Sequence, residues 1–155
     1  MMLRSVLMML CLLAAAPVLA EVSVDELLAR DDAPEGVVFE IIGSEDALPD
    51  LIPQVRQDID ALRARWPGLE IAIVSHGREQ FALMRGEAAV YTEMHQAVQQ
   101  LVSDEDVPVH VCGTHAEWRG VTAEQFPDYV DVAAAGPAQI NDYRALGYEL
   151  VVVSD

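Results

Sequence analysis

The sequence predicts an α/β protein with a three-layer α/β/α arrangement around a mostly parallel five-stranded sheet. Short runs rich in β-branched residues recur along the chain and alternate with amphipathic stretches at helical spacing. Such alternation favours right-handed crossover connections that cover both faces of a parallel sheet. No linker, repeat or low-complexity tract interrupts the pattern. We therefore expect residues 36–155 to form one domain, preceded by an N-terminal arm over residues 21–35.

Residues 1–20 have the pattern of a cleaved secretory signal. Arg4 is their only charged residue, an apolar run follows over residues 6–16, and Val18-Leu19-Ala20 resembles an A-x-A-like cleavage site. The apolar run is shorter than the ~20 residues that a helix needs to span a bilayer. We expect cleavage after Ala20, a periplasmic or secreted protein, and no stable membrane anchoring after signal cleavage.

The chain is strongly acidic, with 26 Asp and Glu residues, 9 basic residues and a formal net charge of −17. This charge disfavours nucleic acid and anionic membrane surfaces as partners, because both are themselves negatively charged. The sequence also lacks the Gly-x-Ser-x-Gly motif of serine hydrolases, a phosphate-binding glycine-rich loop and a dinucleotide-binding fingerprint. These function classes are therefore set aside.

The first half of the chain predicts two strands and one long helix. Residues 21–34 are acidic and carry a short helical pattern, which we expect to form an arm rather than a core element. The runs at residues 37–42 and 69–75 predict the first two strands. Between them, residues 49–66 place apolar side chains at helical spacing, and Pro67-Gly68 ends the helix. These apolar residues are Leu51, Ile52, Val55, Ile59 and Leu62.

The middle of the chain is less regular. Residues 78–89 fit no clear period, although a short helix is predicted around residues 81–84. Residues 90–102 have helical spacing, and residues 103–106, a serine followed by three acidic residues, are expected to form a turn.

The last part of the chain returns to alternating strands and helices. Residues 107–112, 130–134 and 148–153 predict the third, fourth and fifth strands. A short helix is expected at residues 114–119, and a longer one at residues 137–146, where the proline in its first turn is well tolerated.

Cys112 is the main candidate for a functional residue. Once the signal and its Cys11 are removed, it is the only cysteine, and an odd cysteine in an exported protein suggests a reactive thiol. It lies where a strand gives way, through Gly113, to a helix start, whose unpaired N–H groups stabilise an anion. The thiolate is the form that attacks electrophiles and binds metals. The alternative is a buried, inert cysteine that packs as a small apolar residue.

Three histidines are candidate neighbours of that thiol. His110 precedes Cys112 by two residues and faces the same side of the strand, His115 follows by about one helical turn, and His76 ends the neighbouring strand. One imidazole would act as the acid–base partner that activates the thiol. Alternatively, His110, Cys112 and His115 would bind copper or zinc. Structural roles in the core or an interface for His110 and in a turn for His76 remain alternatives, and His95 is expected at the surface or in packing.

The segment Cys112-Gly-Thr-His-Ala-Glu-Trp-Arg119-Gly120-Val121 resembles the cysteine loop of the DsrE/DsrF-like sulfur-relay family. In that family a cysteine at a strand end is followed, across a short helix, by an Arg-Gly-hydrophobic step. The order of other segments is similar too, including Ile-Ala-Ile-Val-Ser-His76-Gly77 and the ending from Ala-Ala-Gly136 to Gly147-Tyr148. The resemblance covers residues 36–153.

The resemblance implies a DsrE/YchN-like fold, assembly into homo-oligomers such as trimers or hexamers, and sulfur carried as a persulfide on Cys112. With the signal segment, it implies an exported member of the family that exchanges sulfur with a donor or acceptor protein. Two other hypotheses remain. One is a non-catalytic module that binds copper, zinc or a small ligand, and the other is an oligomeric scaffold with an inert thiol. Trp118, which lies in the cysteine loop, would shield the thiol or pack at a subunit contact.

Overall fold

A five-stranded sheet forms the centre of the protein in the computed structural model, which describes residues 21–155. The strand order is β4-β3-β2-β1-β5, and every pair of neighbouring strands is parallel. The strands are β1 (Gly36–Ile42), β2 (Ile71–Ser75), β3 (Val109–Cys112), β4 (Asp131–Ala133) and β5 (Tyr148–Ser154). The predicted fold class is confirmed. The predicted signal, residues 1–20, lies outside the described residues.

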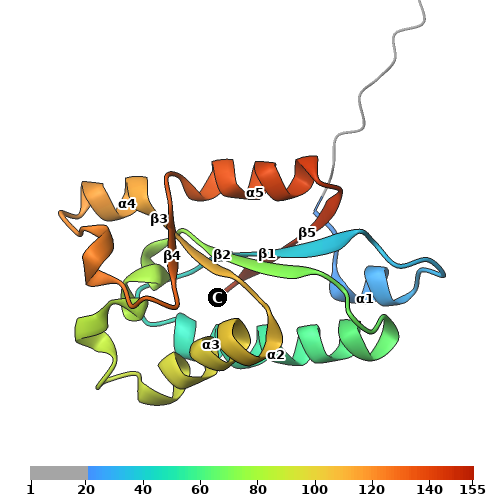
Figure 1. Cartoon of the computed structure of the whole chain (residues 1–155), viewed down its shortest axis with the longest axis horizontal. Helices are drawn as coiled ribbons and strands as arrows, with labels where there is room; N and C mark the ends of the chain where they lie inside the picture. Colours follow the sequence, from blue (N-terminus) through green and yellow to red (C-terminus); the bar gives the residue numbers. More distant parts are fainter. Residues whose placement is uncertain (1–20) are drawn as a thin grey trace, which may run out of the picture.

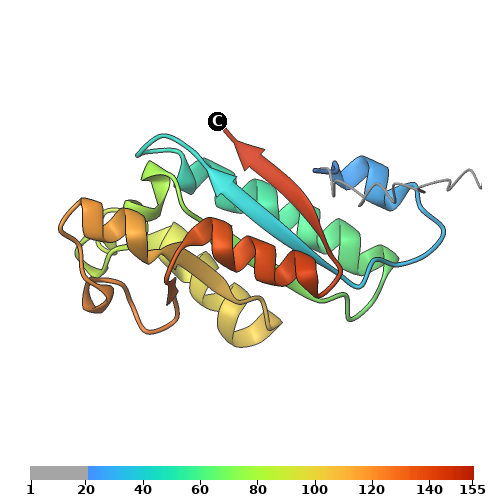
Figure 2. The same ribbon diagram turned by 90° about the horizontal axis from the view of Figure 1, so that it is seen from above.

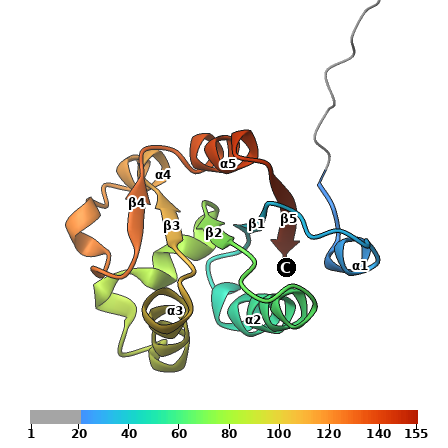
Figure 3. The ribbon, with the colours of Figure 1, turned by 45° about the vertical axis from the view of Figure 1, so that its right-hand side comes forward.

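Helices cover both faces of this sheet, which produces the predicted three layers (Figure 1). Helices α2 and α3 lie on one face and α5 on the other, as the turned view also shows (Figure 3). The α-helices are α1 (Val24–Leu28), α2 (Leu48–Arg65), α3 (Thr92–Glu105), α4 (Gly113–Trp118) and α5 (Gly136–Ala145). Short 3₁₀ helices are η1 (Arg78–Leu83), η2 (Arg85–Glu87) and η3 (Ala123–Gln125). None of the helices within residues 21–155 combines the length and apolarity needed to cross a membrane.

Strand β1 shows how the sheet supplies two cores at once. Val37, Phe39 and Ile41 are fully buried in the large core under α2 and α3. Val38 packs on the other face with Ile140 of α5. Successive strand residues point to opposite faces, so a central parallel strand is apolar on both sides. Burial on both faces makes this strand costly to disturb, and truncating a side chain such as Phe39 to alanine would cost about 3–5 kcal/mol.

Helix α5 runs above the sheet from the β4 side to β5 (Figure 2). The chain has to cross β3, β2 and β1 to join these two edge strands. Side chains at alternate positions of a strand face the same side of the sheet. By the register of the strands, the side that Val38 and α5 share also receives the side chains of Glu40, His76, His110 and Cys112. This layer contains few apolar residues, so polar side chains gather beneath the helix.

The N-terminal segment is part of the core, which differs from the expectation of a separate arm. Leu27 of α1 is fully buried in the large core. Ser23 and Glu26 form a reciprocal capping box that starts α1, and Val22 N donates to Leu150 O of β5 at 2.8 Å. A single turn of helix can place only one or two side chains in the core, so its sequence contains too few apolar residues to predict a core element.

The acidic stretch after residue 102 is helical rather than a turn. Helix α3 continues to Glu105, and Asp106 ends it in the left-handed conformation with φ 56°. Arg56 of α2 binds the Glu105 carboxylate at 2.9 Å, and Arg63 donates to the Glu105 carbonyl at 2.8 Å. Arg63 thus satisfies a carbonyl group at the end of the helix and Arg56 holds the last side chain, contacts that local sequence does not reveal.

Candidate functional site

Cys112 is the last residue of β3 and the N-cap residue of α4, so its predicted position is confirmed. Strand β3 pairs with β2 so that Val111 lies opposite Ser75, which brings His76 to the strand end beside Cys112. Cys112 is 5% exposed, and its Sγ accepts the backbone N–H of His115 at 3.4 Å. A donor directed at sulfur stabilises negative charge on that atom.

Gly113 and Thr114 fasten the start of α4 to the end of β4. A Cβ at Gly113 would lie 2.8 Å from the Ala133 carbonyl oxygen, closer than real contacts allow. Thr114 donates to the Ala134 carbonyl oxygen with both its backbone N–H, at 3.1 Å, and its hydroxyl, at 2.8 Å. The close approach therefore needs glycine and fixes the direction in which the cysteine loop leaves the sheet.

His115 turns back from α4 toward the end of β2. Its Nδ1 lies 3.0 Å from the carbonyl oxygen of His76. A carbonyl can only accept, so Nδ1 carries the proton and Nε2 is the basic nitrogen of the neutral ring. The ring meets Phe81 of η1 edge-on, with 5.1 Å between the ring centroids. His115 therefore has a fixed orientation one turn beyond the thiol.

His76 is held by a carboxylate that sequence analysis did not single out. Its Nε2 lies 2.6 Å from Oε1 of Glu40 in β1, and both side chains are largely buried. Because the carboxylate accepts, Nε2 carries the proton and Nδ1 is the basic nitrogen of neutral His76. A Cβ at Gly136, the first residue of α5, would lie 2.4 Å from the Cβ of His76. In the sequence, the only indication that Glu40 has a special role is that it is a lone acidic residue inside a β-branched run.

Glu79, in the stretch that fitted no sequence period, joins the ends of two strands. It is fully buried. Its carboxylate accepts the N–H of Gly43 at 2.7 Å, the hydroxyl of Ser75 at 2.7 Å and the N–H of Gly77 at 2.9 Å. Three donors compensate a buried carboxylate, which would otherwise be costly to desolvate. Glu79 thus anchors the loops after β1 and β2 beside the candidate site.

Gln80 makes the direct link from η1 to the cysteine. It is fully buried, and its Oε1 accepts the backbone N–H of Cys112 at 2.7 Å. Its Nε2 is buried and has no hydrogen-bond partner among the described residues. An unmatched buried donor typically costs about 1–3 kcal/mol. Gln80 was also missed by sequence analysis, since a polar residue in an aperiodic stretch gives no sign that it is buried.

His110 faces the same side of the sheet as Cys112, as predicted, but its ring is bound to α5. Its Nε2 lies 2.8 Å from the hydroxyl of Tyr143, and its Nδ1 lies 3.9 Å from a carboxylate oxygen of Asp131. Burial lowers the pKa of His110, and the Asp131 carboxylate opposes that shift. His110 thus has a structural contact with the helix layer.

The residues of the alternative metal site have separate partners. His110 contacts Tyr143, His115 contacts the His76 carbonyl, and Cys112 accepts a backbone N–H. Within residues 21–155, no group of three or more His, Cys, Asp or Glu residues is arranged to hold a metal ion. His95 is buried and forms hydrogen bonds with Tyr129 and the Ala82 carbonyl. Of the two roles expected for it, at the surface or in packing, it has the packing role.

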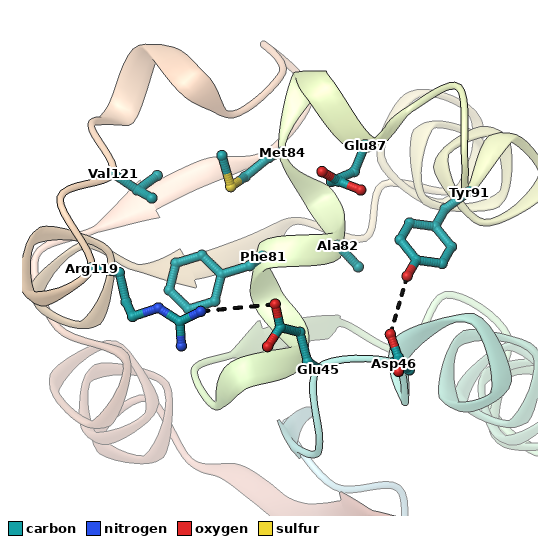
Figure 4. Close-up of a pocket in the computed structure, with 9 residues that line it drawn as sticks. All are labelled: Glu45, Asp46, Phe81, Ala82, Met84, Glu87, Tyr91, Arg119 and Val121. Carbon is teal, nitrogen blue, oxygen red and sulfur yellow. Dashed lines mark hydrogen bonds and ion pairs between the residues drawn. The ribbon is translucent and has the colours of Figure 1, made fainter.

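A cavity of about 260 Å³ adjoins the cysteine loop through Phe81 and Arg119 (Figure 4). The Arg119 guanidinium lies over the Phe81 ring, 4.7 Å from its centroid, and is 3.8 Å from the Glu45 carboxylate. On the opposite side, Tyr91 donates to Asp46 at 3.3 Å. Desolvation and, after it, the Asp46 carboxylate raise the pKa of Tyr91. Cys112 does not line this cavity.

The fold is similar to that of two solved structures. The protein of unknown function MTH1491 from Methanobacterium thermoautotrophicum has a TM-score of 0.60 and 16% sequence identity, covering 76% of this chain and 99% of that one. The YchN protein from E. coli has a TM-score of 0.55 and 17% identity, with the same coverage of 76% and 99%. At these identities the likeness shows a shared fold. Neither a protein-family model nor a curated protein matches the sequence.

Proposed function

We propose that this protein handles sulfur outside the cytoplasm and carries sulfane sulfur as a persulfide on Cys112. The observation that carries the proposal is the position of this sole described cysteine. It ends β3, caps α4 and receives the N–H of His115 on its sulfur. The resemblance of residues 112–121 to a sulfur-relay loop and the YchN-like fold support the same function.

The proposed step is a displacement at sulfur. The Cys112 thiolate attacks a terminal sulfur of an inorganic polysulfide dianion, one S–S bond forms, and the adjacent S–S bond of the polysulfide breaks. The products are the Cys112 persulfide anion and a polysulfide dianion shorter by one sulfur atom. Charge and electrons balance without another oxidant, reductant or metal cofactor. His76 or His115 takes up the thiol proton, for which each neutral ring has a basic nitrogen.

Mass spectrometry tests this proposal directly. Incubation of the purified protein with inorganic polysulfide should add mass in steps of one sulfur atom. Cys112→Ser, which keeps the size of the side chain but removes the sulfur, should abolish the addition. An unmodified wild-type thiol after the same incubation would show that Cys112 is not a sulfur carrier.

We also propose that the protein is periplasmic or secreted and that it forms a homo-oligomer, a trimer or a hexamer. Trp118 of α4 supports association because it is 80% exposed within the cysteine loop. Tryptophan is enriched among the residues that contribute most of the binding energy at protein contacts. A sulfur donor or acceptor protein would meet the same loop. Export predicts a processed chain that begins at Glu21, which the intact mass of protein recovered from the periplasm or medium would test.

A further inference from the structure

The side-chain amide of Gln80 has an N–H group near Cys112 that donates to no described group. Gln80 is fully buried, and its Oε1 is engaged by the Cys112 N–H at 2.7 Å. This bond fixes the orientation of the amide, because exchanging its oxygen and nitrogen would set two donors against each other. Nε2 is therefore the free end of the amide, and it is buried without a partner within residues 21–155.

We propose that Nε2 of Gln80 binds the second sulfur atom of the Cys112 persulfide, an inference that rests on the proposed function. In the described state Sγ accepts the His115 N–H at 3.4 Å, and Nε2 makes no hydrogen bond to Sγ. A persulfide adds one sulfur beyond Sγ and carries its negative charge on that outer atom. Each sulfur then accepts one hydrogen bond: the inner sulfur from the backbone N–H of His115 and the outer sulfur from the side-chain N–H of Gln80.

Burial restricts what this donor can bind. Cys112 is 5% exposed and Gln80 is not exposed at all. An atom attached covalently to Cys112 can reach such a donor more readily than a free molecule can. Hydrogen bonds to an ionised acceptor are about twice as strong as those between neutral groups. The site therefore suits a single anionic sulfur, held away from water and from soluble thiols that would remove it.

Nuclear magnetic resonance of the side-chain amides tests the contact. The two Nε2 protons of Gln80 are observed in ¹⁵N-labelled protein before and after incubation with inorganic polysulfide, and mass spectrometry measures sulfur addition on the same sample. The expected result is a shift of the Gln80 amide protons that appears with the added sulfur. The exposed Gln96 and Gln99 side chains on α3 serve as internal controls and should not move.

The outcomes separate the two proposals. Sulfur addition without a change at Gln80 overturns the present inference and leaves the persulfide function standing. No sulfur addition overturns both, since no second sulfur then exists for Gln80 to bind. Sulfur addition with a Gln80 shift that is absent in Cys112→Ser supports both.

Two variants test the energetic role of the donor. Gln80→Glu keeps an oxygen for the Cys112 N–H but loses the donor, and Gln80→Met loses both the donor and that acceptor without adding charge. Both should lower the ratio of persulfide to free thiol about tenfold at a fixed polysulfide concentration. A wild-type ratio in a folded Gln80→Met protein would overturn the inference, and thermal melting establishes that each variant is folded.

Discussion

The imidazole of His76 lies 2.6 Å from the Glu40 carboxylate, a contact that joins the end of β2 to the middle of β1 beneath α5. The carboxylate selects the ring nitrogen that carries the proton and leaves the other nitrogen basic. His76 lies at the strand end next to Cys112. Under the proposed function, the pair would provide an oriented base on the strand beside the thiol, the arrangement that cysteine nucleophiles commonly use.

Glu40→Ala should slow the reaction of Cys112 with iodoacetamide near neutral pH. Without the carboxylate, His76 loses its orientation, and a misplaced base typically costs a factor of about 10 or more. Rates measured over a range of pH give the profile. Glu40→Gln, which can still accept from His76 through its amide oxygen, should be less affected. Glu93→Gln on the exposed start of α3 removes the same charge and should leave the rate unchanged. Equal rates in Glu40→Ala and wild type would rule out this role of the pair.

Gly136→Ala should destabilise the protein and disturb the same pair. The added Cβ would lie 2.4 Å from the Cβ of His76, so the start of α5 or the ring has to move. Overpacking of this kind costs about 1–3 kcal/mol, which urea unfolding measures. Gly86→Ala is the matched control because a Cβ there meets nothing within 4 Å. Equal stabilities of the two variants would contradict the predicted clash.

Glu79→Ala should be among the most damaging single changes near the site. It removes the shared acceptor of Gly43, Ser75 and Gly77 and leaves three donors without their partner. Each unsatisfied buried group costs about 1–3 kcal/mol, so a loss of about 3 kcal/mol or more in the free energy of unfolding is expected. Glu87→Ala on η2 supplies a carboxylate control away from these loops. A loss below about 1 kcal/mol for Glu79→Ala would show that water satisfies the donors instead.

His110 should make stability depend on pH. Burial lowers its pKa from the ordinary value of 6.5. As the pH falls below 6.5, His110 binds a proton in the unfolded chain before it does so in the folded protein. The free energy of unfolding is therefore highest above pH 6.5 and decreases as the pH drops toward the lowered pKa of the folded state. His110→Gln removes this titration. Free energies of unfolding from about pH 8 to about pH 5 should therefore fall more steeply for wild type than for the variant. Parallel profiles would contradict the assignment.

Trp118→Gln should weaken self-association without unfolding the subunit. The ring is 80% exposed, so its loss should change subunit stability by less than about 0.5 kcal/mol. Sedimentation velocity should show a shift toward smaller species. Val90→Thr, at another exposed apolar residue, serves as control and should sediment like wild type. An unchanged distribution for Trp118→Gln would exclude this tryptophan from a subunit contact.

The sequence could predict the strands because their β-branched runs are local signals. It also predicted where Cys112 lies, since a strand followed by glycine and a helical stretch marks that junction. It could not reveal the partners of Cys112. Gln80 and Glu79 lie on a 3₁₀ helix, whose three-residue turns give no amphipathic period, and their importance depends on contacts with distant strands. The pairing of His76 with Glu40 likewise needs the register of β1 with β2.

The attachment of Val22 and Glu21 to Leu150 has a consequence for aggregation. Strand β5 is an edge of the sheet, and an uncovered edge can recruit strands from other molecules. The residues just after the predicted signal protect part of this edge, while the opposite edge strand, β4, has only three residues. This N-terminal segment would thus protect the β5 edge against strand addition. Loss of its first few residues would expose the protein to edge-to-edge polymerisation while leaving the cysteine loop intact.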